Sequence, residues 1–225
     1  MGAAIGQSLQ MAVGVALSPM PIIAVILLLT TAGARRNGPA FVVGWLAGLA
    51  VIGVVVLAVI GPSAQGPRGQ PATWVSWLQL ILGALLLYVS VRQFRGRPTA
   101  GTEPPMPGWM RSVEQFGAVQ SLGVGAFLSG LNVKNLLLAV AAATAIAKTG
   151  VPAGQQAVAY AVFAVLATLT VAAPVAIYLS MGERSANLLG RLKGWMSRNN
   201  AVIMSVLCLV IGAKLIGDAI SGLST

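Results

Sequence analysis

The residues with the greatest chemical potential interrupt an apolar run in the second half of the chain. Asn132, Lys134 and Asn135 follow shortly after Ser129-Gly130. Glycine weakens a helix, so we expect a break there and a new helix start that Asn132 could cap. A helix N-terminus attracts anions, and the Lys134 ammonium adds a full charge. The pattern predicts a site for phosphate, sulfate or carboxylate. The alternative is that Lys134 pairs with a structural acid or reaches water at a helix end.

A second interruption lies near the N-terminus, where Ser18 is followed by Pro19 and Pro21. Proline removes a backbone donor and clashes with the preceding turn, so this pattern also predicts a broken helix. Both interruptions follow the same G-x-x-L-S motif, at 14–18 and 125–129. We interpret them as two breaks that meet in one substrate site; the alternative is a pair of simple kinks whose serines bond back to their own helices. The candidate substrate-binding residues are Ser18, Pro19, Pro21, Ser129, Asn132, Lys134 and Asn135.

Two further charged residues, Lys214 and Asp218, are four positions apart near the C-terminus. This spacing puts them on one helical face, which predicts a local ion pair; a coupling role in proton relay is the alternative. The chain has no histidine and a single cysteine, Cys208. We therefore expect no metal site, no cofactor and no internal disulfide. Without a P-loop or a nucleophile–base pair, the chain is not expected to be an enzyme.

The surroundings of these residues are those of a membrane protein. The chain has 225 residues, of which 57% are hydrophobic and only 8% charged, against about 25% charged in soluble domains. A bilayer core needs roughly 20 apolar residues per helix. We expect an all-α, polytopic protein with six transmembrane helices, the first and fourth of them broken. The six apolar runs cover about 3–31, 39–60, 73–91, 116–147, 153–181 and 201–220.

The runs divide into two halves of three. Besides the G-x-x-L-S motif, residues 81–86 resemble residues 210–215, which links the third run to the sixth. Three spans per half give the halves opposite orientations, so we predict an inverted repeat. The predicted units are a three-helix repeat at 1–98, a cytoplasmic linker at 99–112 and a second repeat at 113–225. Within the second run, Gly44-x-x-x-Gly48 predicts close helix packing.

The charge distribution predicts an orientation. The net charge is +10, and almost all charges lie between apolar runs, which is typical of topogenic loops rather than of nucleic-acid binding. Ten basic residues follow runs one, three and five, whereas Arg68 and Lys148 follow runs two and four. The ten are Arg35, Arg36, Arg92, Arg95, Arg97, Arg111, Arg184, Arg191, Lys193 and Arg198. By the positive-inside rule these ten are cytoplasmic, and both termini are extracytoplasmic.

Three stretches resemble the GAP family, the peptidoglycolipid-addressing proteins, within the LysE-like transporter superfamily. They are residues 14–26, residues 38–48, which include Gly38-Pro39-Ala40-Phe41, and residues 131–139, and the likeness covers nearly the whole chain. Val133 departs from the Asn-Pro-Lys-Asn that the resemblance leads us to expect. The resemblance implies six helices in two inverted halves. It also implies export of envelope glycolipids or related amphiphiles from the bacterial cytoplasmic (inner) membrane.

Three functions remain open from the sequence. The first is a transporter that exports or flips an anionic lipid or glycolipid, with Lys134 holding the headgroup. The second is a LysE-type exporter of amino acids or other small zwitterions, and the third is a membrane scaffold that transports nothing. A lateral opening to lipid favours the first, and a cavity open only to water favours the second. The predicted partners are membrane lipids and the lipid substrate, a homodimer is compatible with the sequence, and no nucleic acid is expected.

Overall fold

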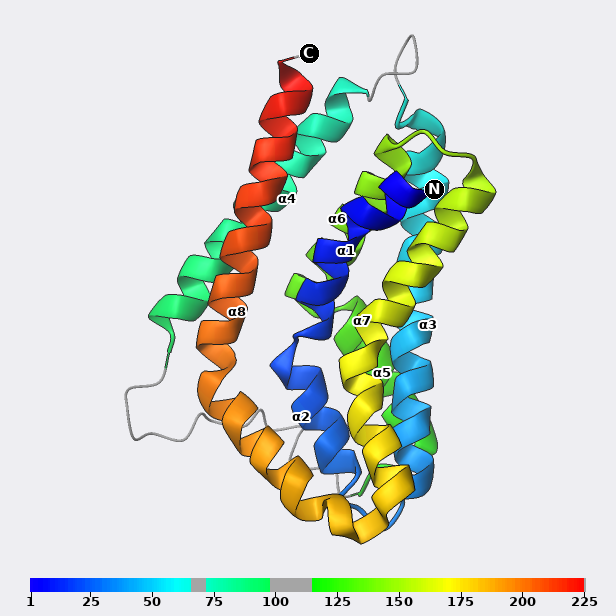
Figure 1. The fold of residues 1–225 in the computed structure, drawn as a ribbon, viewed down its shortest axis with the longest axis vertical. Helices are drawn as coiled ribbons and strands as arrows, with labels where there is room; N and C mark the ends of the chain where they lie inside the picture. The colour runs from blue at the N-terminus through cyan, green and yellow to red at the C-terminus, as the bar shows by residue number, and fades with distance from the viewer. Residues whose placement is uncertain (66–71, 98–114, 225) are drawn as a thin grey trace.

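The computed structural model describes residues 1–65, 72–97 and 115–224, and these form helices without β-strands. The linker predicted at 99–112 lies outside the described residues. Figure 1 shows the helices as an elongated bundle with both termini at one end. The α-helices are α1 (Gly2–Ala16), α2 (Pro19–Leu28), α3 (Ala34–Ile60), α4 (Thr73–Arg95), α5 (Ala118–Gly130), α6 (Val133–Lys148), α7 (Ala153–Met181) and α8 (Ala186–Leu223), with short 3-10 turns η1 (Gly61–Ser63) and η4 (Gly182–Ser185).

Several of these helices are candidate membrane spans. Three helical stretches are long and apolar enough: α3 with η1, α4, and the stretch from α7 through α8. The pairs α1–α2 and α5–α6 pass the same test together, although they are bent by 53° and 63°. This makes five candidate spans if each bent pair crosses once. The α7–α8 stretch itself reverses at Gly182, whose φ of +59° suits glycine, and Figure 1 shows the two helices running in opposite directions.

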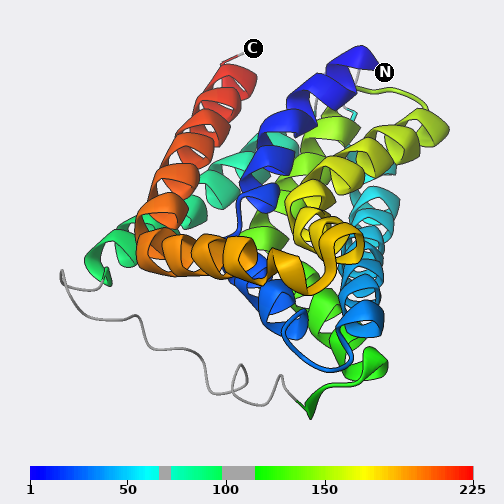
Figure 2. The same cartoon turned by 60° about the horizontal axis from the view of Figure 1, so that its bottom comes forward.

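The basic segment 182–200 lies between the fifth and sixth predicted runs, where the sequence suggested a loop, but it is helical. The helix α8 begins at Ala186 rather than near residue 201. Leu189 and Met196 turn one side of this segment inward, while Arg191 and Trp195 are exposed. Such spacing makes an amphipathic helix, which the low average hydropathy of the segment conceals. Figure 2 shows this first part of α8 crossing the end of the bundle before the helix turns toward the C-terminus.

The helix α6 lies at the centre of the bundle. Almost every side chain from Leu138 to Ala147 is buried, and most are alanines. Around it α4 packs on α8, α3 packs on α5, and α1 packs on α7. In the predicted repeat, α1 and α2 correspond to α5 and α6, α3 corresponds to α7, and α4 corresponds to α8. The α3–α5 contact is then equivalent to the α7–α1 contact, and the α4–α8 contact is equivalent to itself. The correspondence is incomplete, because α1 packs extensively on α6 whereas α2 and α5 barely touch.

The contact between α4 and α8 is reciprocal at two glycines. A Cβ atom on Gly83 would lie 2.9 Å from the carbonyl oxygen of Gly212, and one on Gly212 would lie 3.0 Å from that of Gly83. These two residues are equivalent in the match between 81–86 and 210–215. The two backbones therefore approach at equivalent positions, as an axis of pseudo-symmetry would require.

Glycines also bring α3 and α5 into backbone contact, as the Gly44-x-x-x-Gly48 motif predicted. A Cβ atom on Gly44 would overlap the carbonyl oxygen of Leu122. We expect Gly44→Ala to lower the free energy of unfolding by about 1–3 kcal/mol, because a packed backbone cannot move aside. Gly123→Ala on α5, where a Cβ meets nothing within 4 Å, is the matched control. Denaturant unfolding in detergent micelles measures both, and equal stability of the two variants would contradict the close packing.

Candidate functional site

The first break separates α1 from α2 and follows from its prolines. Ser18 has extended backbone angles (φ −85°, ψ 107°), as a residue that precedes proline prefers. Pro19 then begins α2, where a missing N–H leaves no hydrogen bond unmade. Pro21 also lies in this first turn, and both prolines are buried. The sequence therefore stops one helix and starts the next within two residues.

The second break separates α5 from α6, one turn later than the motif predicted. The helix α5 runs through Ser129 and ends at Gly130, so the G-x-x-L-S register does not align the two breaks. Asn132 is the N-cap of α6, and its Oδ1 accepts a hydrogen bond from the Lys134 backbone N–H at 3.2 Å. The predicted cap is confirmed. Val133 occupies the first helical position, where Pro19 stands in the other break.

Two of the last four carbonyls of α1 are satisfied locally. The Val13 carbonyl accepts from the Leu17 N–H at 2.9 Å, and the Val15 carbonyl accepts from the Ser18 N–H at 3.2 Å. A helix end leaves four such carbonyls without helical partners. In a membrane, water cannot satisfy the remainder, so the two other carbonyls must find donors within the protein.

Those two donors are side chains from other helices. Lys134 Nζ on α6 donates to the Gly14 carbonyl at 2.6 Å. The Thr170 hydroxyl on α7 donates to the Ala16 carbonyl. All four terminal carbonyls of α1 are thereby bonded. The Lys134 ammonium also lies at the negative end of the α1 dipole, where a positive charge is stabilised.

A second side-chain bridge joins the two breaks directly. Ser18 Oγ donates to Asn135 Oδ1 at 2.8 Å, and Asn135 Nδ2 donates to the Leu128 carbonyl at 3.0 Å. Both polar side chains are fully buried. Ser129 takes no part in this bridge, because its hydroxyl bonds to the Ala126 carbonyl of its own helix at 3.1 Å. The two breaks therefore meet, through Ser18, Lys134 and Asn135.

The charge at this junction is unbalanced within the described residues. Lys134 is 2% exposed. Of the four acids in the chain, Glu183 and Asp218 are described, and neither forms an ion pair with it. An ammonium carries three N–H donors, and one of them bonds to the Gly14 carbonyl. A buried cation without a counter-charge attracts an anion strongly. The alternative of a structural acid partner finds no support in the described part of the chain.

The predicted pair of Lys214 and Asp218 lies elsewhere, near the C-terminal end of α8. The two side chains form an ion pair across one helical turn and are partly exposed. The local pairing expected from their spacing is confirmed. They are not part of the junction.

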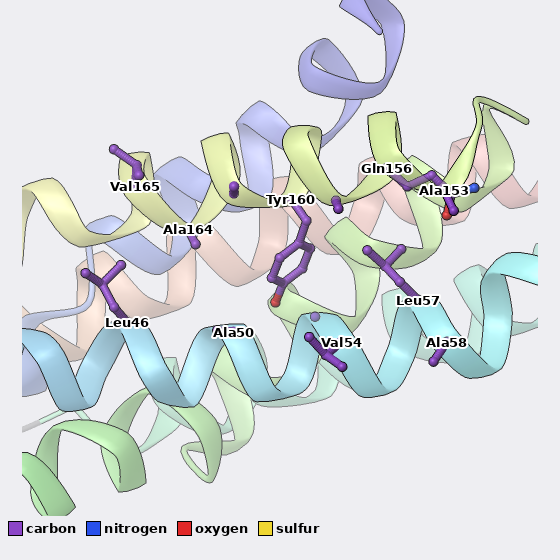
Figure 3. A pocket seen from close by; sticks show the side chains of 13 residues that line it. Leu46, Ala50, Val54, Leu57, Ala58, Ala153, Gln156, Tyr160, Ala164 and Val165 are labelled. Carbon is purple, nitrogen blue, oxygen red and sulfur yellow. The ribbon is translucent and has the colours of Figure 1, made fainter.

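An apolar groove between α3 and α7 is a site that sequence reasoning missed. Its volume is about 490 Å³, within the usual range of ligand sites. Figure 3 shows the Tyr160 ring extending from α7 toward α3 between the two walls, and its hydroxyl donates to the Leu49 carbonyl at 3.0 Å. The lining residues are Leu46, Ala50, Gly53, Val54, Leu57, Ala58, Ala153, Gln156, Ala157, Tyr160, Ala161, Ala164 and Val165.

This groove faces the outside of the bundle. Seven of its lining residues are exposed, at four-residue intervals along each helix. Those on α3 are Ala50, Val54 and Ala58; those on α7 are Ala153, Ala157, Ala161 and Val165. Small side chains at this spacing leave a trough along the surface. The alanines spaced four residues apart on α7 could have predicted the groove. They do not stand out in the sequence, because the surrounding residues are also apolar.

These features define a multi-pass helical membrane protein with a buried polar junction between two broken helices. The model of one protein family, described as Sap, sulfolipid-1-addressing protein (SfLAP), matches residues 9–221. The chain belongs to this family. No curated protein and no solved structure matches it. The match fits the lipid-addressing resemblance seen in the sequence, while membership of the wider LysE-like superfamily stays a prediction.

Proposed function

We propose that this protein carries an anionic lipid or glycolipid across the bacterial cytoplasmic membrane toward the cell envelope, without converting it chemically. The observation that carries the proposal is Lys134, a buried cation that bridges two helix breaks and has no acid partner among the described residues. The name of the family, which refers to addressing of a sulfolipid, supports an anionic lipid as the cargo.

The proposed headgroup site is the junction itself. A sulfate, phosphate or carboxylate group would take the Lys134 ammonium from the Gly14 carbonyl, because two opposite charges add an ion-pair attraction that a neutral carbonyl does not offer. The Asn132-capped start of α6 adds its positive dipole end. Release of the Gly14 carbonyl would weaken the contact between α1 and α6. Headgroup binding and movement of the two bent helices would then be coupled.

The α3–α7 groove is the proposed path for an acyl chain. Its lining is almost entirely apolar, and its walls are exposed on the side that lipid would contact. Each methylene that leaves water contributes about 0.8 kcal/mol. A lipid tail that enters the groove from the bilayer leaves no water, so packing contacts would hold it there. An amino acid or small zwitterion would find few polar partners here. The lateral groove therefore favours the lipid over the small-molecule alternative.

We further propose six spans in two inverted halves, with both termini outside the cytoplasm. The reversal at Gly182, the reciprocal Gly83–Gly212 contact and the basic start of α8 support this arrangement. In a Cys208→Ala background, an impermeant maleimide added to whole cells with a permeabilised outer envelope is expected to label Ser224→Cys and to leave Asn187→Cys unlabelled. The reverse pattern would invert the orientation, and equal labelling of both would mean that α8 does not cross the membrane between residues 187 and 224.

Lipid movement in liposomes tests the function. Purified protein reconstituted in phosphatidylcholine vesicles is expected to accelerate loss of a labelled sulfated glycolipid from the outer leaflet, relative to protein-free vesicles. A labelled phosphatidylcholine should move no faster than in protein-free vesicles, because it carries no net negative charge. Acceleration of neither lipid would leave the scaffold alternative. Uptake of labelled lysine without lipid movement would favour the amino-acid exporter.

A further inference from the structure

A polar cavity of about 320 Å³ is lined by residues near both ends of the chain. Figure 1 shows the two termini at the same end of the bundle. Side chains from four helices, α1, α4, α6 and α8, meet there, so both predicted halves contribute to it. Its volume is large enough for a sulfate or phosphate group with part of a sugar. The lining residues are Gln7, Gln79, Lys148, Lys214, Asp218, Ser221 and Gly222.

The cavity has an excess of positive charge. Lys148 Nζ donates to Gln79 Oε1 at 3.1 Å and has no acid within ion-pair distance among the described residues. Lys214 is paired with Asp218. Two ammonium groups against one carboxylate leave one positive charge, and Gln7 and Gln79 supply uncharged donors.

An unpaired polar group lies beside the cavity, next to Gly222, although it is not one of the lining residues. Ser76 is 1% exposed, and its hydroxyl has no hydrogen-bond partner within the described residues. A Cβ atom on Gly222 would overlap this hydroxyl and would lie 3.1 Å from Lys148 Nζ. Because Gly222 has no side chain, the Ser76 hydroxyl and the Lys148 ammonium both approach this lining residue. A buried polar group without a partner is uncommon in folded proteins, and a bound ligand is one explanation for it.

We propose that this cavity is an anion site that receives the sulfate, phosphate or carboxylate group of a lipid or of a free anion, with Lys148 and Lys214 as its charged contacts. The inference rests on the proposed function in one respect: the cavity would be a second binding site, on the extracytoplasmic side, for the headgroup that leaves the junction. Lys134 and Lys148 stand at opposite ends of α6, which puts them about 21 Å apart along the helix axis. A headgroup released from the junction would meet the next unpaired cation at this end.

Amine acylation read by mass spectrometry tests the site without measuring transport. The protein is held in phosphatidylcholine nanodiscs, and the acylation rate of Lys148 is followed with added potassium sulfate at constant ionic strength. A second arm replaces part of the lipid with phosphatidylglycerol. Protection by sulfate indicates a site for free anions, and protection by phosphatidylglycerol alone indicates a lipid headgroup site. Unchanged Lys148 labelling in both arms would overturn the proposal.

Three variants separate anion binding from a structural role. Lys214→Met should remove the protection of Lys148, and Lys214→Arg should retain it. Asp218→Asn should lower the anion concentration needed for protection by about two- to fivefold, as expected for one partly exposed charge pair. A merely structural ion pair predicts no gain from Asp218→Asn. Protection of Lys148 in a protein that moves no lipid would keep this site and remove the proposed function, whereas lipid movement without protection would do the opposite.

Discussion

Replacing Lys134 with methionine is expected to abolish acceleration of sulfated-lipid movement in reconstituted vesicles, with a loss of at least about a hundredfold. Methionine keeps much of the length and apolar character of the lysine stem but removes the ammonium. Breaking a buried charge contact by removing one partner commonly costs about 3–5 kcal/mol. A headgroup that depends on this cation would lose a comparable share of its binding free energy. The measurement is the initial rate of lipid loss from the outer leaflet, per unit of folded protein.

The variant Thr170→Val is the matched control for this prediction. It also leaves one terminal carbonyl of α1 without its side-chain donor, that of Ala16, but it removes no charge. Both variants should lose stability to a similar extent, since an unsatisfied buried carbonyl costs about 1–3 kcal/mol. Transport should survive in Thr170→Val. Equal loss in both variants would mean that Lys134 only holds the end of α1, and the headgroup role would be wrong.

Filling the α3–α7 groove should block lipids with long acyl chains. Ala157 is an exposed lining residue on α7, and Ala157→Phe would occupy the trough beside Tyr160. Loss of the packing contacts in the groove should slow movement of these lipids roughly tenfold, which corresponds to about 1.4 kcal/mol. An analogue whose chains are too short to reach the groove should be affected much less. The ratio of the two rates, long chain against short chain, is the quantity to measure.

The control for the groove is Ala173→Phe, the same substitution at an exposed position of α7 outside the lining. It should leave both rates unchanged. A groove that instead packs against a second copy of the chain would respond differently. Ala157→Phe would then shift the oligomeric state, which native mass spectrometry measures, and would slow both lipids alike. Such a result would assign the groove to a homodimer rather than to an acyl chain.

Helix positions followed from the sequence where a single local property decides them. The α7 run, predicted at about 153–181, matches the helix Ala153–Met181, because hydropathy and the local residues Pro152 and Gly182 set its limits. The break at Pro19 was also predictable, since proline acts on its own turn. The start of α8 was not, because helix formation there depends on burying Leu189 and Met196 against neighbours that the sequence does not identify.

The candidate site was predictable in part for the same reason. Lys134 and Asn135 stood out as polar residues in an apolar run, and Asn132 was identified as a cap from its type and position. Their partners did not stand out. Thr170 is an ordinary residue of an apolar helix, and Gly14 contributes only a backbone carbonyl. The G-x-x-L-S motif did not align the two breaks, because Ser129 stays helical whereas Ser18 precedes a proline and is extended.

The end of α1 has a consequence for how the protein is made. Two of its final carbonyls are held by Lys134 and Thr170, residues that the ribosome adds more than a hundred positions later. While the chain is being inserted, the first interrupted segment contains no donors for these two carbonyls. Until the second half is inserted, this segment must stay straight, stay near water or form hydrogen bonds with the insertion machinery. The first break therefore acquires its final geometry only after α6 and α7 have been made and have packed against α1.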